Sequence, residues 1–431
     1  MFHNFKKFIV EEEKQKKPIA SVVSKEKKIT DNESNKTSLP SKLPRKKPEK
    51  YLSHIEDAII DHGHEGVKLI ADCLDDAHKL LTGHKAKANY QVKYDGGTSI
   101  IFGIHPETNQ FFIAAKSAPH EKNDKLNYSK EDIQNNYDDS KLKQQLVVAF
   151  YHLPKILPKN TKAGESYGAD IMHTNKDIKI KDKHVYFQPN SIKYSAPSDS
   201  SEGAMAKKSK IGVVIHTKHK EDGSSIPIDK KERNRFIPHP DVNNIDPTLN
   251  VDPKKYTPDN MKEFYKHRDA ASKLYKSMQP ESFDAAMEHA PDIHKYIHVE
   301  HKNGIEPNIE ALIDHLGDEF KNSLNASKTD KNKKEKTSKH TGKLDAVHNH
   351  SAHLDKTLQL HTHLMRAKDV LFHVMAKNIP WIHSLNGLPV NPEGIIAFNQ
   401  DGTAVKYVDR TAYNKQPDVN KKLNKPKKGS K

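Results

Sequence analysis

The sequence predicts an α+β fold built from antiparallel sheets with flanking helices. Short segments of alternating apolar and polar residues, bounded by turn residues, indicate strands before residue 220 and again after residue 389. Apolar residues at helical spacing indicate helices immediately before the first strand. A third, mostly helical pattern separates the two groups of strands. We therefore expect one α+β unit that is interrupted by a helical insertion.

Two helical segments precede the first strand. Ser53-His54-Ile55-Glu56 has the spacing of a capping box, and apolar residues follow it at helical intervals. A second segment runs from Val67 to Leu81, with Gly83 placed to end it. We expect both segments to pack on the first strand, with the single cysteine, Cys73, inside the second helix.

The first strand ends at a lysine beside a sharp turn. Tyr90, Val92 and Tyr94 alternate with polar residues, and Lys93-Tyr94-Asp95-Gly96-Gly97 then breaks the pattern. The two glycines are expected to take positive φ and to let the backbone approach a bound phosphate or sugar. A lysine becomes nucleophilic where burial or neighbouring charge lowers its pKa from about 10.4. An ordinary surface hairpin is the alternative interpretation of these residues.

A second hairpin is predicted near the other end of the chain. Its strands are 391–398 and 404–410, and the turn between them, Asn399-Gln400-Asp401-Gly402-Thr403, contains the Asp-Gly pair that is typical of hairpins. This hairpin places a carboxylate, Glu393, and a lysine, Lys406, on adjacent strands.

Taken in order, these segments resemble the motifs of the covalent nucleotidyltransferases, which include ATP-dependent DNA ligases, RNA ligases and mRNA capping enzymes. Lys93-Tyr94-Asp95-Gly96 is similar to their K-x-D-G motif, Glu393-Gly394-Ile395-Ile396 to their fourth motif, and Lys406 to the lysine of their fifth. Segments similar to motifs Ia, III and IIIa are Lys116-Ser117, 167–172 with Asp170, and 211–216. The closest resemblance, carried also by 187–192 and 406–410, is to uncharacterised RNA-ligase-like proteins of tailed bacteriophages.

The resemblance implies a fold of the ligase adenylation-domain type over residues 50–220 and 385–413. The sequence departs from the family pattern at Val408, where a second lysine is usual, and at Asp170, which replaces a glutamate. No tyrosine, tryptophan or phenylalanine stands in the strand 211–216. About 175 residues separate motifs IIIa and IV, which are normally close together, and we therefore expect a helical subdomain between them.

The resemblance also implies a mechanism. Lys93 would attack the α-phosphate of ATP to form a lysyl-AMP, and Lys406 would stabilise the charge on that phosphate. Asp95, Gly96, Lys116, Asp170, Glu393 and Lys406 are the expected nucleotide-binding residues, and Asp170 and Glu393 the expected ligands of Mg²⁺ or Mn²⁺. AMP would then pass to a nucleic-acid 5′-phosphate end for strand joining. Two alternatives stay open: an inactive fold that binds nucleic acid or a phage protein, and AMP transfer to a protein or small molecule.

The charge of the chain is concentrated at its ends. Residues 1–50 hold 14 Lys/Arg and 7 Asp/Glu, and residues 411–431 hold 7 and 1, so these ends carry a net +13 of the formal +15. We expect disordered basic tails over 1–49 and 414–431, either as arms that contact phosphates without sequence preference or as solubilising segments. No oligonucleotide-binding barrel follows the fifth motif, which favours RNA or single-stranded ends as the partner.

The composition excludes some classes of protein. No apolar run approaches the roughly 18 residues that a membrane span requires, and no apolar signal-peptide core follows Met1. A single cysteine cannot form an intrachain disulfide, which favours a cytoplasmic location, in the host if the chain is phage-encoded. The oligomeric state is not predicted.

The expected insertion covers residues 221–388, between core segments 50–220 and 389–413. Helical patterns occupy 259–279, 281–289, 306–325 and 344–377, and the polar stretch 326–343 predicts a flexible linker. The last helix is rich in histidine, and His350 and His353 share a face. Because no cysteine accompanies them and the histidines point in several directions, the sequence favours a solvated helix over a zinc site.

Overall fold

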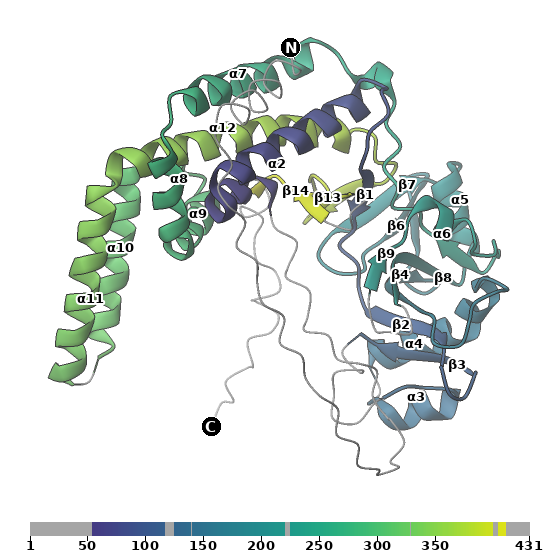
Figure 1. The fold of residues 1–431 in the computed structure, drawn as a ribbon. Coiled ribbons are helices and arrows are strands. Elements are labelled where there is room, and N and C mark those ends of the chain that lie inside the picture. Colours follow the sequence, from purple (N-terminus) through teal and green to yellow (C-terminus); the bar gives the residue numbers. More distant parts are fainter. Residues whose placement is uncertain are drawn as a thin grey trace, which may run out of the picture.

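The computed structural model describes residues 54–116, 125–138, 140–219, 225–327, 329–399 and 404–410. Both predicted basic tails lie outside these residues, as do Ser53, Ser117 and the hairpin turn at 400–403. Figure 1 shows the long helices gathered on one side of the molecule and the large sheet on the other. The predicted α+β class is therefore confirmed. Among the described residues, no helix combines the length and the apolar character needed to cross a bilayer.

The first sheet joins the two ends of the described chain. It contains β1 (Asn89–Lys93), β13 (Gly394–Phe398) and β14 (Ala404–Tyr407) in the order β1-β13-β14, with both pairings antiparallel. The predicted pairing of the second hairpin is thereby confirmed. Residues near position 90 and residues near position 400 thus share one sheet.

The second and third sheets are formed by the middle of the chain. The second has the order β10-β8-β4-β2-β3, with β9 added at β8: β10 (Val242–Asn244), β8 (Ile211–His219), β4 (Ser166–Thr174), β2 (Ser99–Ile104), β3 (Phe111–Ala115) and β9 (Ser225–Pro227). The third has the order β12-β11-β7-β6-β5: β12 (Leu388–Pro389), β11 (Ile382–Leu385), β7 (Lys193–Pro197), β6 (His184–Phe187) and β5 (Lys179–Lys181). Only the β10–β8 pair is parallel among the described strands.

The segment between β1 and β2 links two different sheets and is not a hairpin. β1 pairs with β13, whereas β2 pairs with β3 and β4. The simple surface-hairpin interpretation of this segment is therefore wrong. The K-x-D-G turn therefore connects β1 of the first sheet to β2 of the second sheet.

The helix before β1 positions that strand. It is α2 (Ala58–Leu81), which bends at Gly63 and ends before Gly83, whose φ of 75° is the left-handed conformation expected of a helix-ending glycine. Cys73 is buried in α2, as predicted. The carboxylate of Asp76 accepts hydrogen bonds from the backbone N–H groups of Lys87 and Ala88 at 2.7 and 3.0 Å and so fixes the loop that leads into β1.

Most remaining helices form a layer that packs on α2. The long helices are α7 (Lys262–Lys276), α8 (Pro280–Glu288), α9 (Ala290–Asn303), α10 (Ile309–Asn325), α11 (Asp330–Asn349) and α12 (Ser351–Ala376). α12 contacts α2, α7 and α8, and Figure 1 shows α10 and α11 projecting side by side from this layer. Shorter helices cover the second and third sheets: α3 (Lys130–Asn136), α4 (Lys141–His152), α5 (Ser201–Lys208) and α6 (Lys230–Arg233).

The prediction of a flexible linker at 326–343 is wrong, because α11 covers most of these residues. The Thr329 side chain accepts a hydrogen bond from the backbone N–H of Asn332 and caps the helix. Lysine and glutamate are good helix formers, and a helix that is polar almost all round can lie at the surface when a neighbour supports it. Lys336 provides such support by donating from Nζ to the carbonyl of Ser323, at the end of α10.

The expected limits of the insertion also need correction. β9 and β10 extend the second sheet beyond residue 220, and β11 and β12 complete the third sheet before residue 389. The helical layer itself occupies 262–376. These short strands carry few alternating residues, so their sequence pattern is weak, and their pairing depends on partners far along the chain.

Candidate functional site

The register of the first sheet places Lys93 and Lys406 on one face. Lys93 pairs with Gly394, Gln91 pairs with Ile396, and Ile396 pairs in turn with Lys406. Directly opposed residues of an antiparallel sheet project to the same side, and residues two apart along a strand do so as well. The two lysines, 313 positions apart in the sequence, thus project from the same surface.

Glu393 completes a group of three charged side chains at this surface. It directly precedes β13, and its Oε1 accepts a hydrogen bond from Lys93 Nζ in a close ion pair. The Lys93 side chain is 36% exposed and that of Glu393 is 19% exposed, so the pair is partly shielded but open to a ligand. Burial raises the pKa of Glu393 above its usual value, against the opposing effect of Lys93.

Lys406 is partly buried, as Lys93 is. Burial lowers its pKa, and the positive charges of Lys93 and Arg410 lower it further. Three positive side chains therefore lie near one another and are only partly solvated. Such a surface favours the binding of an anionic group such as a phosphate.

A buried network of charged residues contacts the segment that directly follows β14. Lys368 of α12 lies fully buried, with Nζ 3.2 Å from Glu56 Oε1 and 2.8 Å from Asp369 Oδ1. Arg410 Nη1 lies 2.6 Å from Asp57 Oδ1. The pKa of Glu56 is lowered to about 2, because the attraction of Lys368 and its other neighbours outweighs the effect of burial.

This network also accounts for Val408, the position where a second lysine was expected. Lys368 Nζ donates to the backbone carbonyl of Val408, and the Val408 side chain is buried. The network therefore fixes the strand that carries Lys406. Sequence reasoning missed Glu56, Asp57 and Lys368, since ionic residues within a helical pattern normally indicate a solvated face.

Asp95 holds a loop of the third sheet. Its carboxylate accepts hydrogen bonds from Asn190 Nδ2 at 2.8 Å and from the backbone N–H groups of Ser191 and Ile192, both at 3.0 Å. Its own backbone N–H donates to the Tyr194 hydroxyl at 2.7 Å. This connects the K-x-D-G segment with the segment 187–192, which the sequence comparison had singled out separately.

The expectation of positive φ at Gly96 and Gly97 is wrong, because neither residue is among those with left-handed backbone. Close packing requires them instead. A Cβ on Gly96 would lie 2.5 Å from the Cβ of Asp170, and one on Gly97 would lie 3.0 Å from the Ile171 carbonyl oxygen. Gly96 therefore brings the end of the first sheet directly against Asp170 of the second.

Asp170 stands in the middle of β4. Its Oδ1 accepts a hydrogen bond from Ser99 Oγ at 2.5 Å and lies 3.7 Å from His216 Nε2. Burial raises the pKa of Asp170, but His216, Ser99 and Lys116 together lower it below its usual value. The carboxylate is thus held in its charged form.

Lys116 directly follows β3 and lies next to Ser99, the residue that pairs with Asp170 in the second sheet. Its backbone N–H donates to the Ser99 carbonyl at 3.0 Å, and its side chain is exposed. The structure therefore gathers the predicted residues in two groups that meet at Gly96: Lys93, Glu393 and Lys406 on the first sheet, and Asp170 with Lys116 on the second.

The carboxylates of Asp170 and Glu393 suit Mg²⁺ or Mn²⁺ by their chemistry, since both ions prefer oxygen ligands. They belong to no cluster of three or more metal-ligating side chains in the described part of the chain.

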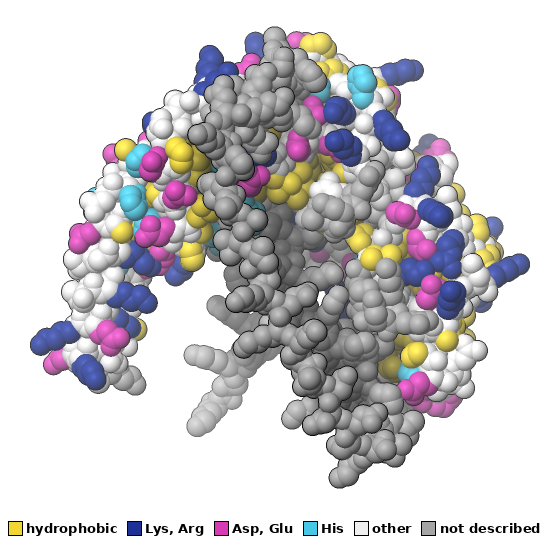
Figure 2. Space-filling model, viewed as in Figure 1, with side chains coloured by type: hydrophobic (Ala, Val, Ile, Leu, Met, Phe, Trp, Pro, Cys, Tyr) yellow, Lys and Arg dark blue, Asp and Glu magenta, His cyan; other side chains and the backbone are white. Residues whose placement is uncertain are grey.

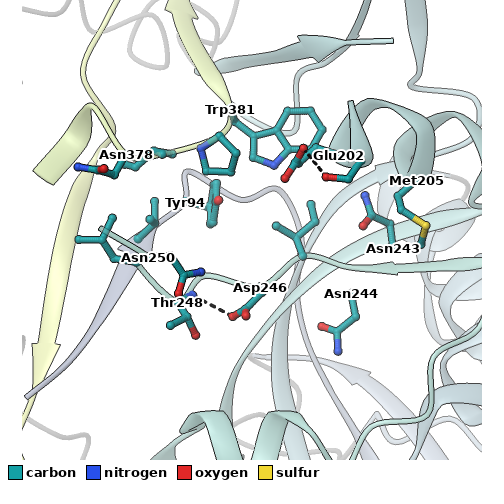
Figure 3. A pocket seen from close by; sticks show the side chains of 16 residues that line it. Tyr94, Glu202, Met205, Asn243, Asn244, Asp246, Thr248, Asn250, Asn378 and Trp381 are labelled. Carbon is teal, nitrogen blue, oxygen red and sulfur yellow. Dashed lines mark hydrogen bonds between the residues drawn. The ribbon is translucent and has the colours of Figure 1, made fainter. Parts of the chain in front are cut away.

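A cavity of about 420 Å³ lies on the opposite face of β1. Val92 and Tyr94 line it, and these residues alternate with Lys93 along the strand. Figure 3 shows Trp381 and Asp246 among its other walls. The cavity is therefore separate from the group of lysines.

The chain belongs to the family described as "Family of unknown function (DUF6267)", whose model matches residues 49–422, nearly the whole sequence. No curated protein and no solved structure matches the chain.

Proposed function

We propose that this member of the family is a covalent nucleotidyltransferase of the RNA-ligase type. In this proposal Lys93 takes AMP from ATP and passes it to the 5′-phosphate end of a nucleic acid for strand joining. The observation that carries the proposal is the group Lys93, Glu393 and Lys406, assembled on one face from distant parts of the chain. A surface hairpin has no reason to hold two lysines and a partly buried carboxylate together.

The ion pair with Glu393 provides a route for the proton that Lys93 must lose. A protonated lysine cannot attack, and the raised pKa of Glu393 makes its Oε1 a better proton acceptor than a solvated carboxylate. Lys93 Nζ then forms a bond to the α-phosphorus of ATP, the bond from that phosphorus to the pyrophosphate oxygen breaks, and pyrophosphate leaves. Lys406 stabilises the negative charge on the α-phosphate.

Asp170 would hold the divalent ion in this proposal, because Glu393 takes up the proton from Lys93 and a protonated carboxyl group is a poor metal ligand. The ion supplies positive charge that offsets the crowded phosphates. The charged state of Asp170, supported by Ser99, His216 and Lys116, favours this role. Asp95 acts as a positioning residue, since it fixes the loop 190–192 beside the K-x-D-G turn.

A nucleic-acid partner is supported mainly by the charge at the ends of the chain. Figure 2 shows lysine and arginine mixed with aspartate and glutamate over the described part of the visible face. The ends outside the described residues carry most of the net positive charge. We therefore expect salt-dependent binding that weakens when both ends are removed.

Labelling with radioactive ATP tests the proposal. The purified full chain is incubated with α-labelled ATP and Mg²⁺ or Mn²⁺ and then run on a denaturing gel. Label should remain on the wild type and be absent from Lys93→Ala, and it should fall strongly in Lys406→Ala. Lys85→Ala is the matched control, since Lys85 is an exposed lysine of the loop before β1 and should leave labelling unchanged.

The later steps are tested with defined ends. RNA and DNA strands that carry a 5′-phosphate are added to the labelled protein, and transfer of AMP to the strand supports end joining. AMP release that no end stimulates favours a protein or small molecule as the acceptor. If ATP, NAD and GTP all fail to label the wild type, the proposed activity is refuted and a nucleic-acid- or protein-binding role takes its place.

A further inference from the structure

Three potential metal ligands meet at a junction of four helices. Glu288 is the last residue of α8, and His289 lies between α8 and α9. His350 lies at the break between α11 and α12. Residues about 60 positions apart in the sequence are thereby brought to one place.

The ligand atoms of this cluster lie close together. One atom from each of Glu288, His289 and His350 lies within 4.8 Å of the others. Ligand atoms around a tetrahedral zinc ion lie about 3.4 Å apart, given zinc–nitrogen distances of about 2.0–2.1 Å. Small side-chain rotations would close the remaining difference, and the exposed Glu288 is free to make one.

The two imidazoles have buried nitrogens that lack a partner among the described residues. Nε2 of His289 and Nδ1 of His350 are both in this state, and the whole His289 residue is only 6% exposed. A buried polar atom without a partner destabilises a protein, and a bound ion would give both of these nitrogens a partner.

The local charges are compatible with a cation. The positive charge of Lys343 acts on His289, but its Nζ lies 2.9 Å from Asp292 Oδ1, and that carboxylate offsets its charge. Glu288 adds a negative charge to the cluster itself.

Three other histidines of the helical layer, His267, His353 and His363, have hydrogen-bond partners. His353, which shares a face of the sequence pattern with His350, has Nδ1 3.0 Å from Ser282 Oγ. His267 and His363 lie with their Nδ1 atoms 3.1 Å apart, close enough to share a proton. The pair suggested by helical spacing, His350 with His353, is therefore not the one that the fold brings together.

We propose that Glu288, His289 and His350 form a zinc site that joins the α8–α9 turn to the break between α11 and α12. Two imidazoles and a carboxylate are a common donor set for Zn²⁺, with a water molecule as the fourth ligand. The bound ion would hold the projecting α10–α11 pair at a fixed angle to α12 (Figure 1). This inference concerns the helical layer and does not depend on the proposed nucleotidyltransferase activity.

Metal titration of the full chain, without an affinity tag, tests the site. The protein is stripped with a chelator and titrated with Zn²⁺ by calorimetry, and the titration is repeated with Co²⁺, whose visible spectrum reports tetrahedral coordination. The variants are His350→Ala and Glu288→Gln, and the matched control is His348→Ala, an exposed histidine two residues from His350. Glu288→Gln is included because Glu288 is exposed, and its substitution leaves the packed core unchanged.

We expect one tight site in the wild type and in His348→Ala. Loss of a ligand should weaken Zn²⁺ binding by more than about tenfold, the smallest loss that is typical even of residues that only support a ligand. Zinc should also raise the melting temperature of the wild type but not that of His350→Ala. Equal affinity and stoichiometry in all four proteins, or the absence of a tetrahedral Co²⁺ spectrum, would overturn the proposal.

Discussion

The contact between Gly96 and Asp170 leads to a prediction about stability that needs no assumption about activity. A Cβ at position 96 would meet the Cβ of Asp170 at 2.5 Å, its Cγ at 2.9 Å and Oδ2 at 3.0 Å. The Asp170 Cβ cannot turn away like the end of a long side chain, because it is attached directly to β4. The backbone of the K-x-D-G turn or of β4 must shift to accommodate the substitution Gly96→Ala.

The magnitude follows from two opposing effects. Inserting a methyl group into a packed contact costs about 1–3 kcal/mol. Replacing glycine by alanine reduces the entropy of the unfolded chain and returns about 0.4–1 kcal/mol. We therefore expect Gly96→Ala to lower the free energy of unfolding by about 1–2 kcal/mol. Urea unfolding followed by circular dichroism measures this change as a lower midpoint with an unchanged slope.

Gly342→Ala is the matched control for this experiment. Gly342 lies within α11, and a Cβ there would meet nothing within 4 Å. Alanine is favoured over glycine inside a helix by about 0.5–1 kcal/mol, so this substitution should stabilise the protein. If Gly96→Ala were as stable as the wild type, the close approach of the two sheets at this turn would be refuted.

Three further predictions concern the supports of the site and the buried histidines. Lys368→Ala leaves Glu56 buried without its main partner and should lower the free energy of unfolding in urea by about 3–5 kcal/mol. The control Lys266→Ala removes only a surface pair with Glu263 and should change this free energy by less than about 1 kcal/mol. Equal effects of the two substitutions would contradict the buried network. Asp95→Ala removes the acceptor of the Ser191 and Ile192 N–H groups and should destabilise the protein by about 1–3 kcal/mol. It should also reduce labelling by ATP, and normal labelling would show that this loop does not position the site. Burial lowers the pKa of His173 and of His383 to about 4, so both stay neutral in the folded protein while their unfolded forms take up protons below about pH 6.5. Stability should therefore fall as the pH drops from 6.5 toward 4, by up to about 1.4 kcal/mol per histidine and pH unit. His173→Gln should flatten a plot of melting temperature against pH, and an unchanged plot would argue against a buried neutral ring.

The strands nearest the proposed nucleophile could be predicted from the sequence because their signals are local. Tyr90, Val92 and Tyr94 alternate cleanly, and β1 lies where this pattern predicts it. Gly83 ends α2 as expected, since a helix end depends on the few residues around it. The β13–β14 pairing could be predicted from two short apolar runs that are separated by an Asp-Gly turn.

Features that depend on distant partners could not be predicted in this way. The role of Gly96 comes from β4, some 70 residues away, and the sequence alone suggested a left-handed turn instead. The buried Lys368 lies within a helical pattern, and its charge is compensated not only by the adjacent Asp369 but also by Glu56 and the Val408 carbonyl, which are distant in sequence. α11 was missed because a polar composition indicates disorder unless a neighbouring helix supports it.

The most direct test of the proposed function is to locate the AMP group on the chain. The protein is incubated with ATP and a divalent ion, digested at neutral to alkaline pH to preserve the phosphoramide, and analysed by peptide mass spectrometry. We predict AMP on Nζ of Lys93, with the modification lost in Lys93→Ala and reduced in Lys406→Ala. AMP on any other residue, or no covalent AMP at all, would contradict the assignment of Lys93 as the nucleophile.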